Sequence, residues 1–320
     1  LKLLEEICQA PGVPGHEERI REVVIRELEP LVDTLDVDNM GNVIAMRKGK
    51  PAKKGGNTKL MLSGHMDEIG FMVRHIDDNG FLRFSTLGGF DPKTLTAQRV
   101  LVHTRSGDLM GVMGTKPIHL MSEEERRAGL KLDNFFIDLG LPKREVARKV
   151  RVGDTVTRER AFVTIGQTVN SKSLDDRVGV FVMIEAVRKA KKHGVDLYAV
   201  ASVQEEVGLR GAITAANRIG PDIGIALDVT LANDLPDAKP HETVAALGGG
   251  TAIKLMDSSV IAHRKLVDYM VKTAETKKIP YQMEVLPAGG TDTAAMQRSG
   301  DGAIAGCVSI PCRYVHSVIE

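Results

Sequence analysis

Short apolar segments alternate with helical segments over most of this 320-residue chain. Helices are expected near the start of the chain and then at residues 177–193, 209–218 and 264–276. Buried strands are expected at residues 60–62, 198–203, 223–227, 252–255, 281–286 and 303–308. Strands that read as continuous apolar runs are covered on both faces. The alternation therefore predicts an α/β fold, with a mixed, mostly parallel sheet and helices on both of its faces.

Residues 69–166 interrupt this alternation with short strands and tight turns. The turns at residues 78–80 (DNG) and 106–107 (SG) are typical of β-hairpins. The flanking parts, residues 1–68 and 167–320, carry the α/β pattern, and neither contains a whole sheet. We therefore expect one discontinuous α/β domain that holds an inserted, small β-rich domain of barrel-like form.

The composition argues against several classes of function. A net charge of +1 provides no large electrostatic surface for nucleic acid or an anionic membrane. No apolar run approaches the roughly 20 residues that span a bilayer. The three cysteines follow no zinc-finger or disulfide pattern, which favours a reducing, cytoplasmic location. A basic, glycine-containing loop at residues 47–59 is expected to be mobile and indicates no function.

Two adjacent acids, Glu205 and Glu206, follow the predicted strand at residues 198–203. Paired buried carboxylates are costly unless a cation or a proton neutralises them. Other polar side chains also follow predicted strands. They are His65 and Asp67 after residues 60–62, Asp228 after residues 223–227, and His316 after the short segment 311–315 that follows the last strand. Because sites in α/β sheets form beyond the carboxyl ends of strands, most of these residues are expected at one edge of the sheet.

Each of these residues taken alone has a simpler explanation. A single histidine such as His65 is more often structural, and the pair Asp175-Asp176 at a helix start commonly interacts with the helix dipole. Asp292 also opens a predicted helix, so capping and substrate contact explain it equally well. Taken together, however, so many acids require cations, and a mixed set of histidines and carboxylates suits Zn²⁺ or another divalent ion.

Six short motifs, in order along the chain, make the sequence resemble the tetrahedral (TET) aminopeptidases. These belong to the glutamyl aminopeptidase family of dinuclear metallopeptidases, of which some members are named endoglucanases. The motifs are GHMDEIG (64–70), SKSLDDR (171–177), QEEVG (204–208), LDVT (227–230), GGTD (289–292) and RYVHS (313–317). The resemblance covers essentially the whole chain, and it implies a dinuclear metallopeptidase fold for the α/β domain.

The resemblance implies a site for two divalent ions, Zn²⁺ or Co²⁺. Asp175 would bridge the two ions. His65 and Asp228 would complete the ligands of one ion, and Glu206 and His316 would complete those of the other.

The resemblance also implies catalytic roles. Glu205 would be the general base that activates water, and Asp67 would hydrogen-bond the far nitrogen of His65 and set its tautomer. Successive side chains of an extended chain point in opposite directions, so we expect Glu206 to bind metal while Glu205 faces the water. The implied activity is removal of N-terminal residues from peptides.

By the same resemblance, residues 69–166 correspond to a dimerisation domain, and the dimers would assemble into a hollow dodecamer. Two other interpretations stay open at this point. A glycoside hydrolase would use two carboxylates across a sugar bond, although aromatic residues for a sugar cleft are scarce here. A scaffold protein with a degenerate site is the non-enzymatic interpretation, and the full ligand set argues against it.

Overall fold

The computed structural model describes residues 1–50 and 56–320, so the centre of the basic loop at 47–59 lies outside the described residues. Contacts between residues divide the described chain into two compact units. Unit 1 comprises Leu1–Glu68, Ser173–Val315 and Glu320, and unit 2 comprises Ile69–Lys172 and His316–Ile319. Within the described residues, no helix combines the length and the hydropathy needed to cross a membrane.

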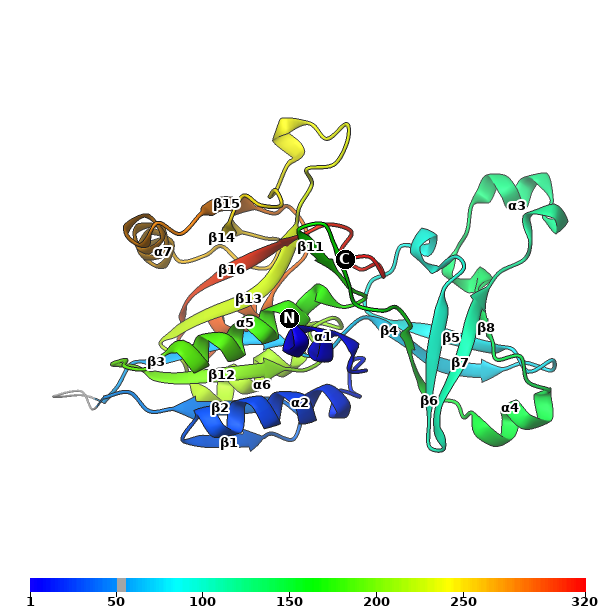
Figure 1. Cartoon of the computed structure of the whole chain (residues 1–320), viewed down its shortest axis with the longest axis horizontal. Helices are drawn as coiled ribbons and strands as arrows, with labels where there is room; N and C mark the ends of the chain where they lie inside the picture. The colour runs from blue at the N-terminus through cyan, green and yellow to red at the C-terminus, as the bar shows by residue number, and fades with distance from the viewer. Residues whose placement is uncertain (51–55) are drawn as a thin grey trace. The chain divides into compact units, whose positions relative to one another are not determined.

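An eight-stranded sheet forms the centre of unit 1 (Figure 1). Its order is β1 (Thr34–Val37), β2 (Val43–Arg47), β12 (Asp196–Ser202), β3 (Lys59–His65), β13 (Ile223–Leu231), β16 (Ile304–Cys312), β14 (Thr251–Met256) and β15 (Tyr281–Val285). The central strands β12, β3, β13 and β16 run parallel to one another, as do β14 and β15. The pairs β1–β2, β2–β12 and β14–β16 are antiparallel, so the sheet is mixed and mostly parallel.

Helices cover both faces of this sheet. On one face, α1 (Lys2–Gln9), α2 (Glu18–Leu28) and α5 (Leu174–Lys189) share a core with β2 and β12. On the other face, α6 (Arg210–Ile219) and α8 (Asp292–Gln297) pack against β3, β12 and β13. Helix α7 (Arg264–Lys277) packs on β14 and β16. Two single-turn 3₁₀ helices complete the unit, at Glu29–Leu31 and Pro240–Glu242.

The alternation of side chains along β3 explains this two-faced burial. Leu62 packs against the core of α2 and α5, whereas its neighbour Met61 packs against α6 and α8. Both faces are apolar because both are covered. The predicted α/β fold class is therefore confirmed.

Two strands run further than their apolar runs predict. His65 is the last residue of β3 and Asp228 lies inside β13, whereas the sequence places both after their strands. Backbone pairing continues through the polar residues, since His65 pairs with Ser202 and Asp228 pairs with Ser309.

Unit 2 is built around a closed six-stranded barrel (Figure 1). Its strands are, in barrel order, β4 (Gly70–Ile76), β5 (Leu82–Leu87), β8 (Phe136–Asp138), β7 (Gly107–Gly114), β6 (Arg99–Thr104) and β9 (Thr155–Arg158). The hairpins β4–β5 and β6–β7 form at the two predicted turns. Phe71 lies at the centre of the barrel core and contacts the rings of Phe84 and Phe90. The predicted barrel-like form is confirmed.

The remaining elements of unit 2 lie between and after the barrel strands. They are the 3₁₀ helices Pro92–Leu95, Ile118–Leu120 and Leu132–Asn134, the helices α3 (Glu123–Ala128) and α4 (Lys143–Lys149), and the hairpin β10 (Val163–Ile165)–β11 (Thr168–Asn170). The predicted insert ends at residue 166, in the turn of that last hairpin. The compact unit continues through β11 to Lys172 and also takes in His316–Ile319.

Candidate metal centre

The ends of the parallel strands bring His65 and Asp228 to the same level of the sheet. His65 pairs with Ser202 at the end of β12. Ser63, two residues before His65, pairs with Ala226, two residues before Asp228. The parallel register therefore places both side chains at the carboxyl edge of the sheet, as the sequence predicts.

Asp175 and Asp176 open α5 but have different partners. Neither has helical φ and ψ angles, and the peptide bond between them is cis. The Asp176 carboxylate is fully buried and accepts hydrogen bonds from the main-chain amides of His65 and Gly179, both at 3.1 Å. Its bond to Gly179, three residues on, is a helix-capping contact. The Asp175 carboxylate instead lies 3.2 Å from Nε2 of His65.

His65 stands at the centre of a cluster of acids. Ligand atoms of His65, Asp175 and Glu206 all lie within 4.8 Å of one another, and so do those of His65, Asp176 and Asp228. Glu205 Oε2 is 3.8 Å from Nε2 of His65. Nitrogen and oxygen donors gathered at this spacing fit a divalent metal ion such as Zn²⁺, which binds imidazole and carboxylate groups.

Asp67 contacts His65 through its main chain rather than mainly through its carboxylate. Nδ1 of His65 is 3.0 Å from the Asp67 carbonyl oxygen and 3.6 Å from the nearest carboxylate oxygen. The carboxylate oxygens accept the main-chain amides of Glu205 at 3.0 Å and Glu206 at 3.1 Å. The partner of the His65 Nδ1 atom is therefore the predicted residue, Asp67, but the contact is with its carbonyl oxygen and not with its carboxylate.

The segment that carries Glu205 and Glu206 is a turn, so the expectation of an extended chain there is wrong. Strand β12 ends at Ser202, and Gln204 adopts a left-handed φ of 55°. The Glu205 carbonyl accepts hydrogen bonds from the amides of Gly208 and Leu209 at 2.8 and 2.9 Å. Because the backbone turns, the relative directions of the two glutamates are set by this turn and by Asp67.

Burial and like charge shape the protonation of this cluster. Burial raises the pKa values of Glu205 and Asp228 well above their usual range, and neighbouring acids raise them further against the opposing charge of His65. Burial alone would lower the pKa of His65, but the nearby carboxylates of Asp175 and Asp67 hold it well above its ordinary value. The cluster therefore favours bound positive charge.

His316 belongs to unit 2. Its carbonyl oxygen accepts a hydrogen bond from Nη1 of the buried Arg158 at 3.1 Å. Its ring lies over Gly89, where an added Cβ would approach Nδ1 to 3.4 Å. Its role as a ligand beside the acids of unit 1 stays a prediction.

Asp292, for which the sequence left two explanations open, does not cap its helix. The cap of α8 is Thr291, whose side chain accepts the amide of Thr293. Asp292 is buried, and its Oδ2 accepts the hydroxyls of Ser63 and Ser202, both at 2.6 Å. It therefore ties α8 to the strands β3 and β12 directly beneath the cluster.

A buried lysine near Asp228 is absent from the sequence prediction. Nζ of Lys254 lies 2.5 Å from Glu284 and 3.6 Å from Asp257, and all three residues are buried. Thr230 Oγ1 donates to the same Glu284 oxygen at 2.8 Å. A lysine inside the apolar run at residues 252–255 was the signal in the sequence, since a buried ammonium requires acidic partners.

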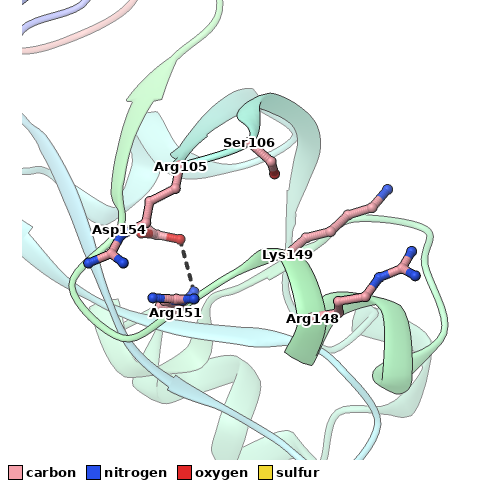
Figure 2. Close-up of a pocket in the computed structure, with 6 residues that line it drawn as sticks. All are labelled: Arg105, Ser106, Arg148, Lys149, Arg151 and Asp154. Atoms are coloured by element: carbon pink, nitrogen blue, oxygen red, sulfur yellow. Dashed lines mark hydrogen bonds between the residues drawn. The ribbon is translucent and has the colours of Figure 1, made fainter.

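A hollow of about 180 Å³ lies in unit 2 and is lined mainly by basic residues. Figure 2 shows Arg105 and Ser106 at the hairpin turn, Arg148 and Lys149 on α4, and Arg151 and Asp154 in the following loop. The one acid among them, Asp154, accepts the main-chain amide of Arg151 at 2.9 Å. This lining has no mixed histidine and carboxylate set, so it does not resemble the cluster at His65.

Comparison with known proteins identifies the family. The family model described as M42 glutamyl aminopeptidase matches residues 41–320. This chain belongs to the M42 family. M42 proteins are metal-dependent peptidases, so the chain is a hydrolase that acts on peptides, an aminopeptidase. A protein of Acetivibrio thermocellus that is inferred to be an aminopeptidase is 43% identical over 319 residues, covering 99% of this chain and 92% of the relative.

Several solved structures share the fold over 99% of this chain. The aminopeptidase APDkam598 of Desulfurococcus kamchatkensis superposes with a TM-score of 0.94 at 41% identity, covering 99% of this chain and 88% of that one. The TET1 peptidase of Pyrococcus horikoshii, which can assemble into a tetrahedron or a large octahedral shell, gives 0.87 at 34% identity over 99% and 92%. A Thermotoga maritima protein named endoglucanase is also similar, at 0.78 and 29% identity over 99% and 90%.

The buried lysine yields a stability prediction. Lys254→Met leaves Glu284 and Asp257 buried without their cation, so we expect the free energy of unfolding to fall by about 3–5 kcal/mol. Denaturant unfolding measures this change. Lys272→Met, at an exposed position of α7, is the control and should change stability by less than about 0.5 kcal/mol. Equal stability of the two variants would contradict a structural role for the ion pairs of Lys254 with Glu284 and Asp257.

Proposed function

We propose that this M42 aminopeptidase binds two divalent ions, Zn²⁺ or Co²⁺, through His65, Asp175, Glu206, Asp228 and His316. The observation that carries the proposal is a pair of donor groups that share His65, one with Asp175 and Glu206 and one with Asp176 and Asp228, each within 4.8 Å. Such a group of buried acids is stabilised by cations, and no side chain of the cluster other than His65 supplies one. His316 enters the proposal through the family resemblance.

Of the two neighbouring aspartates, Asp175 is the better bridging ligand. Both oxygens of Asp176 accept main-chain amides, which uses that carboxylate to hold the start of α5. The Asp175 amide donates to Oε2 of Glu320 at 3.0 Å, which fixes its backbone while its carboxylate faces His65. We therefore assign Asp176 to positioning and Asp175 to metal binding.

Bound divalent ions would lower the pKa of a water molecule and polarise the scissile carbonyl group. Glu205 accepts a proton from the attacking water and later donates it to the amine of the departing peptide. Its raised pKa, caused first by burial, suits a group that must take and return a proton. Asp67 orients His65 and holds the amides of Glu205 and Glu206, so it positions both the ligand and the base.

The substrate in this proposal is the free N-terminus of a peptide. An odd count of three cysteines, all buried, supports a reducing, cytoplasmic location. A glycosidase is not proposed. Its two carboxylates would flank a sugar bond from opposite sides, whereas these acids lie around one histidine.

Removal of metal tests the proposal directly. Exhaustive chelation should abolish hydrolysis of aminoacyl-anilides, because neither the water nor the carbonyl group would then be activated. Adding back Co²⁺ or Zn²⁺ should restore hydrolysis, with about two ions bound per chain by elemental analysis. Activity that survives complete chelation would rule out the metal mechanism.

The general base is tested by Glu205→Gln. The amide keeps the size of the side chain but accepts no proton, so kcat should fall by roughly 10²–10⁴-fold. Metal content should stay at the wild-type value, since Glu205 is not a proposed ligand. The control is Glu5→Gln, on the exposed surface of α1, which should leave kcat unchanged. Near-normal turnover of the Glu205 variant would remove this residue as the base.

We also propose that unit 2 mediates dimerisation and that the dimers assemble into a dodecamer. Unit 2 exposes several large apolar side chains that suit an interface: Met110, Val112, Ile118 and Leu120. The solved structure of a TET1 peptidase similar to this chain has a dodecamer in its asymmetric unit. Light scattering should give a mass near twelve times the 34.7 kDa chain, and Ile118→Asp should lower it. A monomeric wild-type protein would contradict this assembly.

A further inference from the structure

The N-terminal segment, residues 7–17, forms hydrogen bonds to three of the motifs that make up the candidate metal centre. In the motif at residues 171–177, the fully buried Arg177 donates to the carbonyl oxygens of Ile7 at 2.5 Å and Ala10 at 2.7 Å. All of these residues belong to unit 1. The segment therefore does more than connect α1 to α2.

Two further hydrogen bonds join residues 7–17 to the motifs at residues 171–177 and 64–70. Oγ of Ser173 donates to the Cys8 carbonyl oxygen at 2.8 Å. In the motif at residues 64–70, the amide of Glu68 donates to the Gly12 carbonyl oxygen, also at 2.8 Å. Gly12 is required by close packing, because an added Cβ would lie 2.7 Å from Ile20.

Glu17 makes the contact to the third motif, at residues 204–208. Its side chain is 1% exposed, and Oε1 accepts the amides of Gly15 at 2.7 Å and Gln204 at 3.2 Å. A buried carboxyl oxygen that accepts amides from two segments joins those segments, because losing it would leave both amides without this acceptor.

Together, Glu17 and Asp67 accept three consecutive main-chain amides in the turn at residues 204–208, which carries the proposed base. Glu17 accepts the amide of Gln204, and Asp67 accepts those of Glu205 and Glu206. Gln204 is in the left-handed region, with φ of 55°, which a residue other than glycine adopts only when its surroundings hold it there. The direction in which the turn presents Glu205 therefore depends on both carboxylates.

We propose that Glu17 positions the general base. By holding the Gln204 amide, Glu17 fixes the turn in the shape that lets Glu205 reach its water. This inference rests on the proposed role of Glu205. Glu17 contacts neither substrate nor metal in this assignment. Its loss should therefore reduce turnover more than substrate binding, and metal content should not change.

The experiment compares Glu17→Ala, Glu17→Gln and the control Glu22→Ala in the Co²⁺-loaded enzyme. Glu22 is exposed on α2. Glu17→Ala should lower kcat by roughly 10–100-fold with KM within about 3-fold of wild type, because small misplacement of a catalytic group is costly. Glu17→Gln keeps an oxygen at the same reach and should recover most of kcat. Cobalt content and the cobalt absorption spectrum should match those of wild type in both variants.

Several outcomes would overturn the inference. They are a Glu17→Ala variant with kcat within about 2-fold of wild type, a loss of kcat that follows a loss of cobalt, and a Glu17→Gln variant as impaired as Glu17→Ala. If Glu17→Ala does not fold, Glu17→Asp decides, because it keeps the charge but is too short to hold both amides. Wild-type kcat in that variant would also overturn the inference.

Failure of the proposed function would look different from failure of this inference. If the wild-type enzyme hydrolyses no aminoacyl-anilide, or if Glu205→Gln keeps full activity, the proposed mechanism fails whatever the Glu17 variants do. If both of those tests succeed and Glu17→Ala retains its turnover, only the positioning role is lost.

Discussion

Repulsion among buried carboxylates is the constraint around which unit 1 is arranged. The parallel strands end together, and their ends carry more acids than bases. The fold provides separate partners for the acids that are not proposed ligands. Asp67 and Asp176 accept main-chain amides, Asp292 accepts serine hydroxyls, and Glu284 is paired with Lys254. What these arrangements leave around His65 is a compact set of donors, whose negative charge a divalent ion offsets.

For His65 and Asp228, the sequence predicted a common edge of the sheet, because that placement follows from the direction of their strands. Once the strands at residues 60–62 and 223–227 are parallel, His65 and Asp228 reach one edge of the sheet. Sequence reasoning failed at the turn after β12, because the shape of that turn depends on Asp67, which is remote in sequence. It also missed Lys254, since a lysine within a short apolar run says nothing about the glutamate that pairs with it in another strand.

Identical side chains in adjacent positions can have different hydrogen-bond partners. Asp175 and Asp176 have the same side chain and are neighbours in the sequence. The amides of His65 and Gly179 point at Asp176, and the imidazole of His65 points at Asp175. The local sequence does not contain this distinction, because one of those donors lies more than a hundred residues away. Resemblance to a family separates the two aspartates, and the three-dimensional contacts supply the physical reason.

The order of strands in the sheet has a consequence for synthesis of the chain. Strands β2 and β3 are consecutive in sequence, yet β12 lies between them, and β13 is the other neighbour of β3. All pairing in the barrel, by contrast, occurs within residues 70–158. A ribosome that releases the chain from its N-terminus thus delivers every barrel strand before β3 has a neighbour on either side. The carboxyl edge that carries His65 is completed late, so Glu206 and Asp228 can reach His65 only after the barrel strands have emerged.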